Sequence, residues 1–175
     1  MREIESGEEE PMGAFFAKEI LEAAIQIEKN GQLFYELMGQ KAADKPALEV
    51  FNHLAQQEKE HLVHLRHLAN GLADPPETWE REEFSMYMAE LAESHVFRGD
   101  GSAEKAAREV TGDLAAVETG IRFEKDTLLF MEGLRNIVRK QEKEMLEKLL
   151  EWERAHLVEL VRLKWQITGK AKSRP

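Results

Sequence analysis

The chain has 175 residues, which is enough for one domain with a sizeable hydrophobic core. Its 33% charged and 42% hydrophobic residues favour a folded helical protein over a disordered one. The net charge of −10 excludes a general nucleic-acid binder, because no basic stripe could face the phosphates. The absence of cysteine excludes disulfides, thiolate metal sites, iron–sulfur ligation and cysteine nucleophiles.

Two observations concern location. No apolar run approaches the roughly 18 residues that cross a bilayer. The N-terminal sequence MREIESGEEEPMG is acidic and lacks the apolar region of a secretion signal. We therefore expect a cytoplasmic protein that does not enter a membrane.

The first half of the chain predicts a helical hairpin. Residues 1–12 are expected to form a disordered acidic tail, with the folded domain at residues 13–168. Apolar residues recur at helical spacing from about residue 14 to 42 and from about 44 to 69, with ADKP between the two helices. The inward stripes are Ala17, Leu21, Ala24, Glu28, Gly31 and Tyr35 on the first helix, and Phe51, Leu54, Glu58, His61, Leu65 and Leu68 on the second.

A long connection follows at about residues 72–111. The sequence EEFSMYMAELAESHVF predicts a shorter helix there, and AEKAAREV predicts another with Ser102 as its N-cap. The apolar residues of this connection are expected to cover the bundle or to form a dimer interface.

The second half predicts another hairpin. Its helices are expected at about residues 113–138 and 141–167, followed by a basic tail at 169–175. The sequence RNIVRK between the helices contains neither Gly nor Pro. Two hairpins joined by one long crossover predict an all-α four-helix bundle. The expected stripes are Leu114, Val117, Ile121, Glu124, Leu128 and Met131, and then Leu146, Leu149, Glu153, His156, Leu160 and Leu163.

The two hairpins are related copies. AIQIEKNGQLFYE (24–36) shares six of thirteen residues with GIRFEKDTLLFME (120–132). EKEHLVHLRHL (58–68) shares six of eleven with ERAHLVELVRL (153–163). The repeat aligns Glu28 with Glu124, Glu58 with Glu153, and His61 with His156.

The repeated Glu-x-x-His pairs indicate a metal site. Chance supplies about one such match in a chain this rich in glutamate, so the information lies in the duplication at the centre of two apolar stripes. Four ionised carboxylates buried together would cost many kcal/mol in lost hydration and mutual repulsion, and two divalent cations would neutralise them. Carboxylate and imidazole ligands without thiolate favour iron or manganese over structural zinc. The small residues Ala24, Gly31 and Gly120 are expected to leave space for such a centre.

Over residues 14–167, this pattern resembles the ferritin-like superfamily of di-iron carboxylate proteins, and within it the rubrerythrin-like branch. The resemblance depends on Glu28 followed by Tyr35, on Glu124, and on the two Glu-x-x-His pairs. It implies a ferritin-like bundle that holds two iron ions per chain, with manganese as the alternative.

The resemblance also implies a role for each ligand. Glu58 and Glu153 would bridge the two ions. Glu28 with His61, and Glu124 with His156, would complete the two ends, although the pairing of each histidine with a terminal glutamate is left open. The candidate metal ligands and catalytic residues are therefore Glu28, Glu58, His61, Glu124, Glu153 and His156.

The chain departs from typical rubrerythrins in three respects. It lacks a Cys-ligated rubredoxin-type domain, so electrons would come from a separate donor such as a rubredoxin-type protein. Thr127 stands where those proteins have an extra glutamate, and its repeat counterpart is Gly31. The centre would then be symmetric and nearer to those of bacterioferritins. Only about eight residues follow the fourth helix, so a ferritin cage is not expected.

Other residues leave alternatives open. Tyr35 is expected either to hydrogen-bond a ligand carboxylate or to pack in the core. Core or interface packing is favoured for Trp152, with an electron path as the alternative. His64 and His67 are expected on solvated faces, because their repeat partners are Glu159 and Arg162.

The function implied by the resemblance is redox chemistry on peroxide or dioxygen. The alternatives are a ferroxidase that handles iron for a partner, and a bundle that binds metal for stability without turnover. A homodimer is expected, because a long crossover permits exchange between subunits.

Overall fold

A computed structural model of the chain describes residues 12–68 and 81–169; the side chains of 12–19, 81, 82 and 85 are not described. Most of the predicted acidic tail and of the predicted basic tail lies outside these residues. The predicted all-α fold is confirmed. The α-helices are α1 (Met12–Lys41), α2 (Lys45–Leu68), α3 (Arg81–Ser94), α4 (Ser102–Glu109), α5 (Asp113–Leu134) and α6 (Lys143–Ile167).

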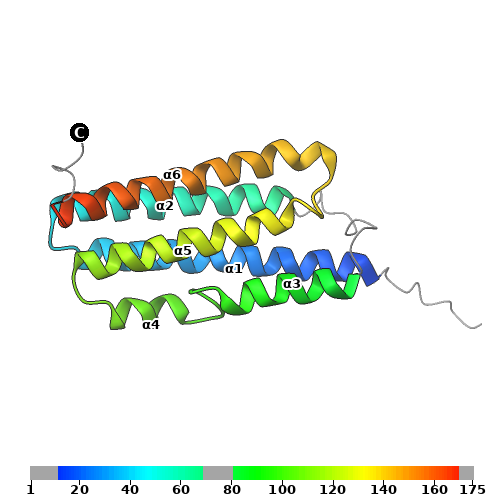
Figure 1. Cartoon of the computed structure of the whole chain (residues 1–175), viewed down its shortest axis with the longest axis horizontal. Coiled ribbons are helices and arrows are strands. Elements are labelled where there is room, and N and C mark those ends of the chain that lie inside the picture. Colours follow the sequence, from blue (N-terminus) through cyan, green and yellow to red (C-terminus); the bar gives the residue numbers. More distant parts are fainter. Residues whose placement is uncertain (1–11, 69–80, 170–175) are drawn as a thin grey trace, which may run out of the picture.

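The four long helices form a bundle of two antiparallel hairpins, α1–α2 and α5–α6 (Figure 1). The hairpins meet where α2 packs against α6 and α1 packs against α5. The crossover helices α3 and α4 run along the outside of α1 and α5 (Figure 1). The bundle therefore has one side covered by the crossover and an opposite side formed by α2 and α6. Among the described helices, none combines the length and apolar character of a membrane span.

The predicted inward stripes of α2 and α6 are buried throughout, as is the described part of the α1 stripe. The prediction for α5 is partly wrong. Leu114 is exposed, and Ile121 and Leu128 are only partly buried. Phe123 and Phe130 are buried instead, because the crossover covers a second face of α5 that the hairpin pattern alone does not reveal.

Helix α5 ends at Leu134, four residues before the end at residue 138 that the sequence predicts. Ile137 and Val138 lie in the connection between α5 and α6 and are buried in the core. Their burial stabilises the end of the helix at this point. Asn136 donates its side-chain amide to the carbonyl of Gly133, which satisfies one of the free carbonyls at the helix end. Burial of apolar residues replaces the Gly or Pro that usually marks such a break.

The crossover is fixed to α1 by Asn30, whose amide donates to the carbonyls of Phe97 and Gly99. The prediction that Ser102 caps α4 is wrong. The cap residue is Gly101, in the left-handed region at φ 77°, and the Ser102 hydroxyl donates to the Gly99 carbonyl. Only glycine adopts this backbone conformation without strain, so the tight entry into α4 requires Gly101.

Two glycines allow α1 and α5 to pack closely. A Cβ atom at Gly31 would overlap the Phe123 ring, and one at Gly120 would lie 3.2 Å from the Tyr35 hydroxyl. The expectation that Gly31 and Gly120 leave space for a metal centre is therefore wrong, because aromatic rings fill the space beside them. The glycines position Phe123 and Tyr35 in the core.

His95 joins the crossover to α5. It is buried, and its Nδ1 atom accepts a hydrogen bond from the Phe97 amide. The proton therefore lies on Nε2, which donates to the Thr127 hydroxyl at 3.2 Å. Burial lowers the pKa of His95 to about 4, so the ring is neutral at pH 7.

We expect Gly31→Ala to destabilise the metal-free protein by about 1–3 kcal/mol, because the added methyl group overpacks the core against Phe123. Without that contact, alanine would stabilise a helix interior relative to glycine. The measurement is urea unfolding followed by circular dichroism. Gln40→Ala, at an exposed position of α1, is the control and should change stability by less than about 0.5 kcal/mol. Equal stability of Gly31→Ala and wild type would contradict the close packing.

We expect His95 to make the fold acid-sensitive. Its pKa is 6.5 as a free side chain and about 4 in the folded protein, so the unfolded chain binds the proton more readily. The contribution is fully present above pH 6.5 and is lost as the pH falls through 6.5 towards 4, by up to about 3 kcal/mol. Urea unfolding of the metal-free protein across this range should show a steeper pH dependence for wild type than for His95→Gln. Parallel curves would show that His95 is not buried in its neutral form.

Candidate metal centre

The structure brings all six predicted residues to one level of the bundle interior. Each lies at the middle of its helix stripe, with fully buried leucines one turn away on either side in α2 and α6. None of the six is more than 3% exposed. They are Glu28 on α1, Glu58 and His61 on α2, Glu124 on α5, and Glu153 and His156 on α6.

Two carboxylates each face both histidines. Glu153 places Oε1 2.6 Å from the Nδ1 atom of His61, and Oε2 3.5 Å from Nδ1 of His156. Glu58 places Oε2 3.3 Å from Nδ1 of His61, and Oε1 3.4 Å from Nδ1 of His156. One donor atom from each of these four residues lies within 4.8 Å of the others. Both carboxylates therefore lie between the two histidines and direct one oxygen towards each.

The other two glutamates each lie beside one histidine. Glu28 Oε2 is 3.5 Å from Nδ1 of His61, whereas Glu124 Oε1 is 3.8 Å from Nδ1 of His156. The sequence left this pairing open. In the structure, Glu28 accompanies His61 and Glu124 accompanies His156.

The donor atoms of the cluster test whether metal ions would fit. Both oxygens of Glu28, Glu58 and Glu153, one oxygen of Glu124, and both ring nitrogens of each histidine are buried without a hydrogen-bond partner. Buried polar atoms are otherwise almost always paired. The atoms approach one another without hydrogen-bond geometry, as expected for groups directed at common points between them. Carboxylate oxygens and imidazole nitrogens suit iron or manganese, so the cluster fits such ions.

Without metal, the cluster balances its charges by moving protons. Burial, reinforced by the negative charges of Glu58 and Glu153, raises the pKa of Glu28 well above its usual range. Burial and the charge of Glu58 raise the pKa of Glu124 in the same way. These two carboxyl groups are therefore favoured in their neutral, protonated form.

The remaining four groups carry charge. Burial opposes ionisation of Glu58, but the neighbouring Glu28 carboxyl group and the two histidines outweigh it and hold its pKa below the usual range. Burial and the charge of Glu58 oppose ionisation of Glu153, and the two histidines outweigh them and lower its pKa. Burial likewise opposes charging of His61 and His156. The adjacent carboxylates outweigh burial and raise the pKa of both rings strongly. Two imidazolium ions thus face two carboxylates, and the metal-free cluster is neutral overall.

Tyr35 makes a direct contact with the cluster. Its hydroxyl donates to Glu124 Oε1, and the tyrosine is fully buried. Burial, reinforced by the negative charge that Glu124 carries once it is ionised, raises the pKa of Tyr35 well above its usual value, so the hydroxyl keeps its proton. Of the two roles left open by the sequence, Tyr35 fulfils both. It packs against Phe51 and Phe123 and also holds one glutamate in place.

A row of aromatic rings beside the cluster was not predicted. Trp152 stacks on His61 with ring centroids 5.4 Å apart, and His61 stacks on His156 at 5.0 Å. The spacing of Trp152 and His156, one helical turn apart on α6, was a signal for proximity to the centre. The contact with His61 depends on how α2 packs against α6, which spacing alone does not specify.

Comparison with known proteins agrees with this geometry. A family model for rubrerythrin matches residues 19–164. The chain belongs to the rubrerythrin family. Searches of the curated proteins and of the solved structures found no significant match. The matched region of this rubrerythrin contains all six cluster residues and Tyr35, and the buried Glu/His cluster suits iron binding.

We expect metal binding to this rubrerythrin to release as many as four protons per chain, two from the imidazolium rings and two from Glu28 and Glu124. The affinity should fall as the pH is lowered, because protons compete for the same atoms. Titration calorimetry of metal-free protein with Mn²⁺, in buffers of different ionisation enthalpy, measures the number released.

Glu28→Gln tests the assignment, because an amide has no proton to release. The variant should lose about one proton from the total. Glu60→Gln, at an exposed position on α2, should release as many protons as wild type. Binding without net proton release would contradict the protonation pattern.

Proposed function

We propose that the centre holds two iron ions per chain and reduces peroxide, or activates dioxygen, with electrons from a separate donor. The observation that carries the proposal is that Glu58 and Glu153 each direct one oxygen towards His61 and the other towards His156. Such carboxylates support two ions side by side. A structural site for one ion would need no second set of oxygens.

The charge of the cluster supports the same count. Once four protons have left, four carboxylates and two neutral imidazoles carry a charge of −4, which two divalent ions balance. A single divalent ion would leave two buried negative charges without compensation, at a cost of several kcal/mol. Two ions are therefore favoured over one.

Bound at this centre, two iron ions that alternate between ferrous and ferric states would supply the two electrons that, with two protons, convert hydrogen peroxide to two water molecules. The residues of the chain hold the reaction in a buried site. Tyr35 restrains Glu124 through one oxygen, which leaves Oε2 of that carboxylate for an ion.

Thr127 distinguishes this centre from one with an additional carboxylate. It is buried one helical turn after Glu124, and its hydroxyl accepts the hydrogen bond from His95. A threonine cannot supply the charge of a glutamate, so we expect no carboxylate to exchange for another at this position. The proposed centre has four glutamate and two histidine ligands.

The electron donor and the assembly belong to the same proposal. These 175 residues contain no cysteine and therefore no Cys-ligated iron site, so we propose a separate donor, such as a protein of rubredoxin type. We also propose a homodimer in the cytoplasm, on the grounds given by the sequence.

We expect anaerobic ferrous protein to be oxidised rapidly by one equivalent of hydrogen peroxide per chain, with the absorption of an oxo-bridged ferric pair. Rapid-mixing spectrophotometry against peroxide and against oxygen-saturated buffer measures both rates. Glu58→Gln should lose the ferric absorption, because one bridging oxygen is replaced by an amide nitrogen, and Glu60→Gln should retain it. Faster oxidation by oxygen than by peroxide would favour a ferroxidase. No oxidation by either, together with metal-dependent thermal stability, would favour a non-catalytic metal-stabilised bundle.

A further inference from the structure

We propose that electrons enter the centre through Trp152, which couples the α2/α6 side of the bundle to the metal ligand His61. The inference rests on the proposed function, because it concerns how electrons reach that centre. It adds an electron-transfer residue and the side of the molecule from which the donor delivers.

Four rings form a continuous row from the interior to the surface. His61 lies between His156 and Trp152, with centroid distances of 5.0 and 5.4 Å and interplanar angles of 13° and 6°. His64 meets the other end of the row, 4.9 Å from Trp152 and at 70° to it. Near-parallel rings in contact overlap through their π-systems, and electron tunnelling is faster through such contacts than across saturated side chains.

The row runs from buried rings to partly exposed ones. His61 is 1% exposed, whereas Trp152 and His64 are both partly exposed. His64 is also held in position, because its Nδ1 atom hydrogen-bonds to the Glu60 carbonyl at 2.9 Å. This row is an aromatic path that connects a predicted ligand to partly exposed rings.

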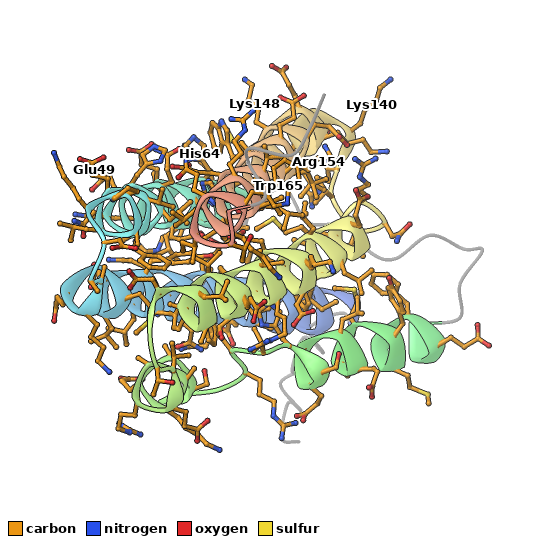
Figure 2. The ribbon with its side chains drawn as sticks, turned by 60° about the vertical axis from the view of Figure 1, so that its left-hand side comes forward. Glu49, His64, Lys140, Lys148, Arg154 and Trp165 are labelled. Carbon is orange, nitrogen blue, oxygen red and sulfur yellow. The ribbon has the colours of Figure 1, made fainter. Side chains whose placement is uncertain are left out.

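The row lies on the side of the bundle that faces away from the described crossover helices α3 and α4. The helices α3 and α4 pack against α1 and α5, so a donor cannot approach the cluster closely from there. Figure 2 shows His64 on the side of α2 and α6 that faces away from α3 and α4. A donor that docks at the α2/α6 side reaches the first ring of the row.

The internal repeat separates this role from simple packing. The residue aligned with Trp152 is Gln57, on α2, and it is also partly buried. A glutamine thus occupies the equivalent position on α2. Packing of α2 against α6 therefore does not by itself require an indole ring at this position. The row is one-sided, and it leads to the Glu28–His61 end of the centre.

The electron transfer is balanced as follows. One electron leaves a one-electron donor, such as an iron–sulfur protein, which is oxidised by one unit, and one ferric ion becomes ferrous. A second transfer completes the pair that one peroxide consumes. Trp152 supplies orbital overlap and is not itself oxidised, so no proton leaves its ring.

The absence of cysteine makes a direct test practicable, because an introduced thiol is unique. Glu60 and Lys125 are exposed, and each is next in sequence to a predicted ligand, His61 or Glu124. A ruthenium polypyridine photosensitiser is attached to Glu60→Cys or, as the control on a helix that does not carry Trp152, to Lys125→Cys. After a reductive laser flash, the loss of ferric absorption gives the rate of electron transfer into the iron-loaded protein.

We expect faster transfer from the label at residue 60 than from the label at residue 125. Trp152→Leu should slow transfer from residue 60 and should leave the rate from residue 125 unchanged. Trp152→Phe retains a ring and should give an intermediate rate. Trp165→Leu replaces the other described tryptophan of α6 and should change neither rate.

Three further readouts exclude a merely structural effect: iron content, the ferric absorption spectrum and the midpoint potential should match wild type in Trp152→Leu. Loss of iron or a shifted potential would show that Trp152 only positions His61, which would overturn the proposal. Equal rates from the two labels would also overturn it. If the labels show the expected difference but ferrous protein does not react with peroxide or oxygen, the proposed function fails while the electron route stands. If Trp152→Leu does not fold, Trp152→Phe with the two labels decides.

Discussion

Charge balance inside the bundle is the constraint on which the rest of the structure depends. Six ionisable side chains occupy one buried site, and a net charge there would cost several kcal/mol. Two neutral states satisfy this requirement. In the first, protons reside on Glu28, Glu124 and the two histidines. In the second, which is the state that we propose for the metal-loaded protein, two divalent ions would replace those protons.

The helices are arranged so that both states use the same atoms. The Nδ1 atoms of His61 and His156 face the carboxylates in the metal-free cluster and are the atoms that would bind metal. Exchange of protons for ions therefore needs little movement of the backbone. The close packing of α1 against α5, permitted by Gly31 and Gly120, holds the two hairpins at a fixed separation.

Much of this arrangement could be predicted from the sequence because both halves of the chain carry the same pattern of buried glutamate and histidine residues. A carboxylate at the centre of an apolar stripe is conspicuous, and its recurrence in the second half indicates which residues meet. The repeat specified the two hairpins and the level at which the six side chains come together. It could not specify which histidine lies beside Glu28, because that depends on the relative placement of α1, α2 and α6.

Most of the features that were predicted wrongly depend on the crossover or on close packing between hairpins. The second buried face of α5 exists because the crossover covers it. Gly101, rather than Ser102, caps α4, at the end of a loop that hydrogen-bonds to Asn30 on another helix. Phe123 fills the space beside Gly31, a contact between residues far apart in the sequence. Helical periodicity reports on neighbours within a helix and carries no information about these long-range partners.

The two halves of the bundle are copies with unequal surroundings. Tyr35 donates to Glu124, whereas its aligned residue Met131 has no group that could donate to Glu28. Trp152 lies against His61, and its aligned residue is Gln57. A substitution at one of these positions alters one end of the cluster and spares the other. After the ancestral duplication, selection could therefore adjust each half separately while the shared core of the bundle stayed the same.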